Sequence, residues 1–206
     1  MAETIDYFYS HVSPYAYLGH AAFMDMAKRT EVHVRFRPVN LAVVFPETGG
    51  LPLGQRHPKR QEYRWYELQR WAEKRAIALN FKPAHFPTDP GLADRTAIAL
   101  AEAGKSPYEF SLQMCADCWS NEKNIAEEGV VRNALVGLGE DADAVLRDAG
   151  SDNVQAVYAQ NVEDAIRIPA FGSPCFVRDG EPFWGQDRLD LLEDAIVSGR
   201  PAFRPL

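Results

Sequence analysis

The sequence predicts an α/β protein in which two short α/β segments, one at each end of the chain, flank a long all-helical block. Three observations support this prediction. Residues 4–37 show strand, helix and strand patterns in turn, only helical patterns follow up to residue 166, and two short strands with a helix close the chain. A strand, a helix and a second strand in this order are typical of a parallel β–α–β unit. The 206 residues, 46% of them hydrophobic, are enough to bury a sizeable core.

The first segment begins with an aromatic-rich run at residues 4–9, whose alternation suits a half-buried strand. A short polar turn leads to Ser13 and Pro14, which favour the N-cap and first position of a helix, so a helix is predicted from there to about residue 29. A second strand is predicted at residues 32–37. A hydroxyl at the positive end of a helix is also a potential anion site, so Ser13 either caps the helix only or also takes part in chemistry.

The remaining elements follow from the same patterns. Residues 41–54 contain three glycines and two prolines and are predicted to form a loop. Two apolar runs separated by Asp-Gly predict a hairpin at residues 175–184. Residues 1–44 and 170–206 should therefore form one domain, and residues 45–169 a helical insertion. Helices are predicted at residues 57–78, 92–103, 107–119, 125–135, 142–149, 153–166 and from about 189 onward.

Composition excludes several classes of function. A net charge of −7 and a pI near 5.3 argue against nucleic acid as a partner, because phosphate binding requires a basic surface. The first residues lack a basic region followed by an apolar run, and no stretch is long enough to span a membrane, so a cytoplasmic protein is expected. The low, odd count of three cysteines fits a reducing compartment. The five histidines show no metal-ligand spacing, and no metal is predicted.

Two local signals in the sequence have simpler interpretations than a functional site. Cys115 and Cys118 form a Cys-x-x-Cys, but inside a predicted helix rather than at a strand-to-helix turn, where a thiol pKa would be lowered. Buried thiols are therefore favoured over a redox or metal site, and Cys175 is expected in the core. His11 precedes Ser13 by two residues, yet the Gly-x-Ser-x-Gly elbow of an acyl-transfer site is missing, so placement in the turn is favoured.

The order of the elements is that of the thioredoxin topology with a helical insertion, and the chain resembles the DsbA-like superfamily. It is most similar to the branch that contains 2-hydroxychromene-2-carboxylate isomerase and kappa-class glutathione transferase. The resemblance covers nearly the whole chain and rests on these stretches: Phe8-Tyr9 with Ser13-Pro14-Tyr15-Ala16-Tyr17-Leu18, Pro58-Lys59-Arg60 with Arg70-Trp71-Ala72, Phe171-Gly172-Ser173-Pro174, and Phe183-Trp184-Gly185-Gln186-Asp187-Arg188-Leu189.

The resemblance gives Ser13 a specific role. Redox members of the superfamily carry Cys-x-x-Cys in the first turn, where this chain has Ser-Pro-Tyr-Ala. A hydroxyl cannot undergo thiol–disulfide exchange. The resemblance therefore implies that Ser13 is the catalytic residue and stabilises the thiolate of a bound cofactor, glutathione.

The resemblance also assigns residues that would hold glutathione. Pro174 would be the cis-proline of the superfamily, where a trans bond would otherwise be expected, and the backbone of Ser173 would pair with the peptide. Gln186 and Asp187 would hold the γ-glutamyl amine and carboxylate, although Asp187 near a helix start also fits a simple cap. Lys59 would bind a carboxylate of glutathione or of the substrate.

The substrate pocket is assigned to His11, Tyr15 and Arg60, although a solvated basic pair would explain Lys59 and Arg60 equally well. The resemblance implies a glutathione-dependent cis/trans isomerase of aromatic carboxylates resembling 2-hydroxychromene-2-carboxylate, active in aromatic-compound catabolism as a homodimer. Two alternatives stay open: a kappa-like transferase or peroxidase that consumes glutathione, and a non-catalytic thioredoxin-fold module that binds peptides or partners.

Overall fold

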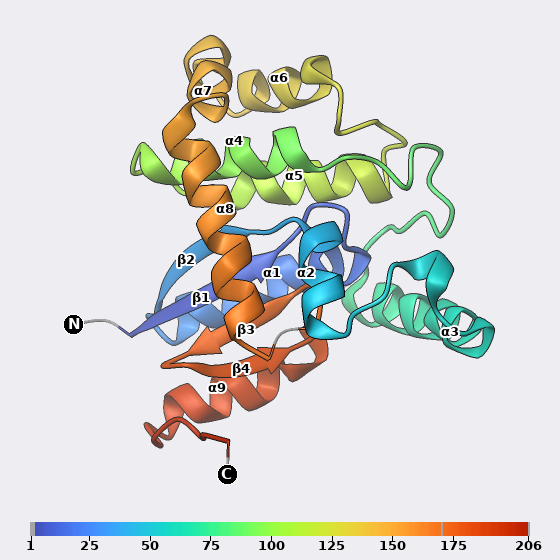
Figure 1. The fold of residues 1–206 in the computed structure, drawn as a ribbon, viewed down its shortest axis with the longest axis vertical. Coiled ribbons are helices and arrows are strands. Elements are labelled where there is room, and N and C mark those ends of the chain that lie inside the picture. Colours follow the sequence, from blue (N-terminus) through green and yellow to red (C-terminus); the bar gives the residue numbers. More distant parts are fainter. Residues whose placement is uncertain (1–2, 170, 206) are drawn as a thin grey trace.

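The computed structural model describes residues 3–169 and 171–205. The predicted order of a β–α–β unit, a helical block and a β–β–α unit is confirmed, and Figure 1 shows the arrangement. The elements are β1 (Thr4–Tyr9), α1 (Pro14–Arg29), β2 (His33–Pro38), α2 (Leu41–Thr48), the 3-10 turn η1 (Leu53–Gln55), α3 (Pro58–Arg75), α4 (Gly91–Glu102), α5 (Tyr108–Trp119), α6 (Glu128–Gly137), α7 (Ala142–Ala149), α8 (Asp152–Arg167), β3 (Cys175–Arg178), β4 (Glu181–Trp184), the 3-10 turn η2 (Gln186–Arg188) and α9 (Leu189–Val197).

The strands form one mixed sheet in the order β2-β1-β3-β4. β1 and β2 are parallel, with Ile5 opposite Val34, as the helix between them predicts. β3 runs antiparallel to β1, with Ile5 also opposite Arg178, and pairs with β4 in a hairpin. Asp179 and Gly180 at the hairpin turn have φ of 45° and 77°, the positive values that a two-residue turn of this kind requires. The two ends of the chain therefore share one sheet.

Alternation along β1 directs side chains to the two faces of the sheet. Ile5, Tyr7 and Tyr9 are buried with residues of α1 and α9 on one face. Phe8 points to the other face and packs with Val44 of α2 and residues of α8. Burying apolar surface on both faces stabilises a central strand. The sheet is thus covered by α1 and α9 on one side and by α2 and α8 on the other.

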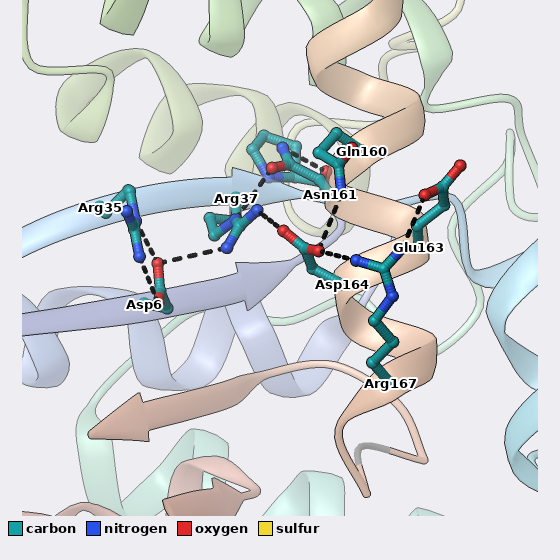
Figure 2. A network of polar contacts seen from close by, with 9 residues as sticks. Asp6, Arg35, Arg37, Gln160, Asn161, Glu163, Asp164 and Arg167 are labelled. Carbon is teal, nitrogen blue, oxygen red and sulfur yellow. Dashed lines mark hydrogen bonds and ion pairs between the residues drawn. The ribbon is translucent and has the colours of Figure 1, made fainter. Parts of the chain in front are cut away.

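A polar network also holds α8 against the sheet (Figure 2). Asp6 of β1 accepts a 2.7 Å hydrogen bond from Arg35 and lies 3.6 Å from the guanidinium of Arg37, both on β2. Arg37 pairs in turn with Asp164 of α8 and donates to the side-chain oxygen of Asn161 at 2.9 Å. Because these groups alternate in charge, each carboxylate and guanidinium along the row lies next to an opposite charge.

The helical block has a core of its own. Phe110, Met114 and Trp119 of α5 are fully buried among side chains of α4, α6 and α7. α3 lies apart from these helices in Figure 1 and packs on α1, where Leu68 and Leu18 are buried in one small cluster. The block therefore reaches α1 from two sides, through α5 and through α3.

One predicted loop is wrong in part. Residues 41–48 form α2 rather than a loop: the side chain of Asn40 accepts a bond from the backbone of Ala42 at its start, and Gly49 ends it with φ of 77°. Pro46 stands in the last turn, where it removes one backbone hydrogen bond, and the helix ends two residues later.

The proposed domain boundaries stay a prediction. Residue 170, where the second boundary falls, lies outside the described residues. The C-terminal half of α8 lies in the predicted insertion, yet Val162 and Ala165 pack on the sheet with Phe8. Within residues 3–169 and 171–205, no helix has the length and apolar character needed to cross a membrane.

We expect His20 of α1 to make stability depend on pH. Its ring is fully buried, 3.0 Å from the Tyr7 hydroxyl and 3.2 Å from the Tyr108 carbonyl, and burial lowers its pKa to about 4. Below a pH of about 6.5, the ordinary pKa of histidine, His20 binds a proton in the unfolded chain but not in the folded one. Stability should therefore fall by up to about 3 kcal/mol as the pH drops from about 6.5 to about 4.

Urea unfolding at pH 7 and pH 4.5 measures this effect. The loss between the two pH values should be smaller in His20→Gln than in the parent protein. His33→Gln, which changes an exposed histidine of β2, should leave it unchanged. An equal pH dependence in all three proteins would rule out the assignment to His20.

Candidate functional site

Ser13 lies where the first strand passes into the first helix. Its extended backbone, with φ of −91° and ψ of 116°, places the hydroxyl as the N-cap of α1, and the oxygen accepts a hydrogen bond from the backbone of Ala16 at 3.2 Å. The same hydroxyl donates to the carbonyl oxygen of Ser173 at 2.9 Å. The side chain is nearly buried, with 5% of the residue exposed. Ser13 therefore joins the start of α1 to the segment that precedes β3.

The Ser173–Pro174 segment closes the site from the other end of the chain. The peptide bond between the two residues is cis, which confirms the predicted isomer. The hydroxyl of Ser173 accepts from the backbone of Ser10 at 3.0 Å, and the carbonyl of Pro174 accepts from the backbone of Gly185 at 2.9 Å. The start of α1 is thus surrounded by backbone groups from three places: Ser10 in the first turn, the Ser173–Pro174 segment, and Gly185 after β4.

Gln186 and Asp187 follow β4 and lie against α1. Gln186 is buried, and its side-chain oxygen accepts two hydrogen bonds from Arg75 at 2.7 and 3.0 Å. A β-carbon at position 19 would fall 2.5 Å from that of Gln186, so glycine is required where α1 and this turn meet. Asp187 is 42% exposed and pairs with Arg188 at 2.6 Å. The carboxylate of Asp187 is therefore accessible, whereas the side-chain oxygen of Gln186 is already hydrogen-bonded to Arg75.

The basic residues at the start of α3 are on the surface. The side chain of Lys59 is 79% exposed and pairs with Glu62 at 2.7 Å, and Arg60 is also exposed. Tyr15, two residues after Ser13, is half-buried. Burial raises the pKa of its phenol, and the guanidinium groups of Arg64 and Arg56 oppose that rise. Tyr15 therefore lies near these two arginines.

His11 lies wholly inside the protein. Its Nδ1 is 2.6 Å from a carboxylate oxygen of Asp94, the first acidic residue of α4, and the hydroxyl of Tyr158 in α8 donates to the other oxygen at 2.8 Å. Within the described part of the chain, Nε2 of His11 is enclosed and has no hydrogen-bond partner. The structure thus places His11 in a buried network behind the turn, and its role toward substrate stays a prediction.

Asp94 and Tyr158 were not found from the sequence, because residues so far apart form no motif. One signal was available: Asp94 is a lone acid in the first turn of a helix built mostly from small and apolar residues. A carboxylate in that position needs donors when it is buried.

An apolar rim borders the site. Phe171 and Trp184 are both partly exposed, and their rings meet edge to face with centroids 5.2 Å apart. They lie just before Ser173 and just before Gly185, so they flank the segment that contacts Ser13. A groove of about 820 Å³ elsewhere in the molecule is lined by β2, α4 and α8 and includes none of the predicted site residues.

The three cysteines are buried and free. Burial raises the pKa of Cys115 well above its usual value and that of Cys118 and Cys175 to about 12. In residues 3–169 and 171–205, no cluster of three or more potential ligands could hold a metal ion. These positions fit core thiols.

A β–α–β unit and a β–β–α unit that meet at a cis-proline segment beside the first helix define a thioredoxin-like protein. A family model described as the DSBA-like thioredoxin domain matches residues 4–197. The chain therefore belongs to the DsbA-like thioredoxin family, with serine at the position where redox members carry cysteine.

The predicted branch of this family is also confirmed by similarity. A 2-hydroxychromene-2-carboxylate isomerase of Sphingobium xenophagum is 28% identical over 199 residues, which are 96% of this chain and 100% of the relative. Glutathione S-transferase kappa 1 of Homo sapiens is 25% identical and covers 93% of this chain and 90% of its own. A solved 2-hydroxychromene-2-carboxylate isomerase, 24% identical, has the same fold, with a TM-score of 0.79 and 95% of both chains covered.

We expect the thiols to be inert in the folded protein. With a pKa of about 12, only about 10⁻⁴ of the Cys118 or Cys175 groups is thiolate at pH 8, and the thiolate is the reactive form. Ellman's reagent should label no cysteine of the native protein within minutes and all three in urea. Rapid labelling of one native thiol would contradict this prediction.

Loss of the buried Asp94 carboxylate should destabilise the protein strongly. Asp94→Asn removes the negative charge and replaces one of the two acceptor oxygens with an NH₂ donor, so either His11 or Tyr158 loses its acceptor, at a cost of about 3 kcal/mol, since a buried polar group left without its partner costs about 1–3 kcal/mol and more when a charge is involved. Tyr158→Phe removes one bond and should cost about 1 kcal/mol. Urea unfolding measures both, with the exposed Asp148→Asn as a control expected to change little. A fully stable Asp94→Asn variant would refute the importance of this network.

Proposed function

We propose that the protein is a glutathione-dependent isomerase that acts on aromatic carboxylates resembling 2-hydroxychromene-2-carboxylate. The observation that carries the proposal is the place of Ser13, a hydroxyl at a helix N-terminus where redox members of the family have a thiol. The names of the relatives support both parts of the proposal, isomerisation from one and glutathione from the other. In this proposal the enzyme is a cytoplasmic homodimer of aromatic-compound catabolism.

The groups around Ser13 fit the chemistry of glutathione. The Ser173 carbonyl offers an acceptor for a peptide N–H, as an added strand would use. The accessible carboxylate of Asp187 suits the γ-glutamyl amine, while buried Gln186 positions this turn against α1. Lys59 at the exposed start of α3 offers a cation for a carboxylate.

Glutathione, when bound, supplies a thiol nucleophile that adds reversibly to a conjugated double bond, permits rotation about that bond while it is single, and is eliminated unchanged. Ser13 stabilises the anionic sulfur in two ways. Its hydroxyl turns from the Ser173 carbonyl to donate to the sulfur, and the positive end of the α1 dipole favours negative charge nearby. Ser173 then exchanges the hydroxyl donor for a peptide N–H, so its carbonyl keeps a partner.

A kappa-like transferase is the second candidate, because the kappa 1 relative covers 93% of this chain. Spectroscopic assays separate the two. We expect 2-hydroxychromene-2-carboxylate to isomerise only when glutathione is present. Conjugation of chlorodinitrobenzene without isomerisation would favour the transferase, and absence of glutathione binding in calorimetry would leave a non-catalytic binding module.

The role of Ser13 is tested with Ser13→Ala. We expect the pKa of the bound glutathione thiol, followed by thiolate absorbance, to lie near 7 in the parent enzyme and to return to about 8.5 in the variant. Loss of one donor to a developing anion should lower kcat/KM about 100-fold.

Ser151→Ala is the matched control, because Ser151 is also an N-cap serine, on α8, whose oxygen accepts from the backbone of Val154 at 3.3 Å. Both variants should lose about 1 kcal/mol of stability as caps. Only Ser13→Ala should change the thiol pKa. An unchanged thiol pKa in Ser13→Ala would reduce Ser13 to a cap.

A further inference from the structure

Arg64 of α3 is a buried cation without an anionic partner. Only 7% of the residue is exposed. Its guanidinium lies 5.8 Å from the ring centroid of Trp119 and 5.5 Å from that of Trp65. Across residues 3–169 and 171–205 it makes neither an ion pair nor a hydrogen bond, although arginines buried in proteins are normally paired. Burial accordingly lowers the pKa of Arg64.

The surroundings of Arg64 add positive charge rather than balance it. Arg56, Arg60 and Arg64 follow one another at four-residue intervals, so Arg60 and Arg64 share one face of α3. In the described residues none of the three has a carboxylate within ion-pair distance, whereas Glu62 and Glu67 on the same helix pair with Lys59 and Arg70. In a chain of net charge −7, an uncompensated row of three arginines indicates a place for an external anion.

Arg64 lies beside the Ser13 end of α1. Leu68 of α3 and Leu18 of α1 are buried in one apolar cluster, against which Tyr15 packs. One turn earlier on each helix, Arg64 and Tyr15 are close enough that the guanidinium opposes the rise in the phenol pKa. Tyr15 is in the first turn of α1, two residues after Ser13. The guanidinium of Arg64 is therefore close to the proposed reaction site at Ser13.

An aromatic ring lies behind the guanidinium. The indole of Trp119, whose ring faces Arg64, is fully buried, and its nitrogen makes no hydrogen bond to any described residue. The indole is closed off, so it serves as a wall next to Arg64, while a guanidinium can only donate and needs an acceptor. A flat ligand that carries an acceptor would match this place.

We propose that Arg64 anchors the carboxylate of the second, non-thiol substrate and so selects aromatic acids over uncharged aromatic compounds. This inference rests on the proposed function. The forked guanidinium suits bidentate contact with a carboxylate, and the Tyr15 and Trp65 rings supply apolar surface for an aromatic body. The exposed Arg60 lies one turn further out and draws the anion toward the site.

Binding of benzoate and of its neutral analogue benzamide tests the proposal. In protein with ¹⁵N-labelled indoles, benzoate should shift the Trp119 resonance, and benzamide should bind at least about ten-fold more weakly. Arg64→Gln and Arg64→Met should each weaken benzoate about 10- to 100-fold, which corresponds to a lost charged hydrogen bond. Arg64→Lys should restore part of the affinity. Arg70→Gln, at an exposed arginine of the same helix, should change nothing.

Each other outcome has a defined meaning. Equal benzoate binding by the parent protein and by folded Arg64→Met, or equal binding of benzoate and benzamide, overturns the proposal. If Arg64→Gln weakens glutathione but not benzoate, the guanidinium holds a glutathione carboxylate, and the assignment to the second substrate is overturned. If glutathione does not bind but benzoate binding still depends on Arg64, the proposed function fails while the carboxylate anchor stands.

Discussion

The buried carboxylate of Asp94 is the constraint on which the candidate site depends. It lies on α4, and it receives His11 from the first turn and Tyr158 from α8. A charged group without water must keep its donors in place, because each one lost leaves an uncompensated charge. The network therefore fixes the turn that carries Ser13 relative to two helices of the inserted block. In this way a helical region remote in sequence determines the geometry of a strand-to-helix turn.

Replacement of cysteine by serine changes what the first turn can do while leaving its capping role intact. The hydroxyl still satisfies the backbone at the start of α1, which is a matter of stability. It has lost the ability to exchange electrons with a disulfide, and the three remaining thiols are buried where burial keeps them protonated. Under the proposed function, a scaffold shared with redox proteins therefore takes its reactive sulfur from a ligand rather than from its own first turn.

Local patterns in the sequence were sufficient for most of the fold. Three local patterns predicted elements that the structure contains: the Ser-Pro helix start, the alternation of residues 32–37 and the Asp-Gly turn. They were reliable because the local preference and burial against the sheet favour the same conformation. The segment at residues 41–48 was mistaken for a loop, since Pro46 looks like a helix breaker when its position in the last turn is unknown. A local pattern placed Ser13 at a helix start, but the roles of Ser13 and Pro174 in a site came from the family resemblance and stay predictions.

The contacts of the residues that surround Ser13 and Pro174 could not be predicted from the sequence. The pairing of His11 with Asp94, of Gln186 with Arg75 and the isolation of Arg64 all depend on which helices meet, and no local preference encodes that.

The shared sheet has a consequence for how this chain acquires its site during synthesis. β1 emerges from the ribosome first, but its neighbour β3 is made only after the whole helical block. The helices of that block contact one another locally and have their own core, so they can form while β1 still lacks one edge partner. The Ser13 hydroxyl can meet the Ser173 carbonyl only after residue 173, which follows the helical block, has left the ribosome. A product truncated before that residue would therefore lack this contact.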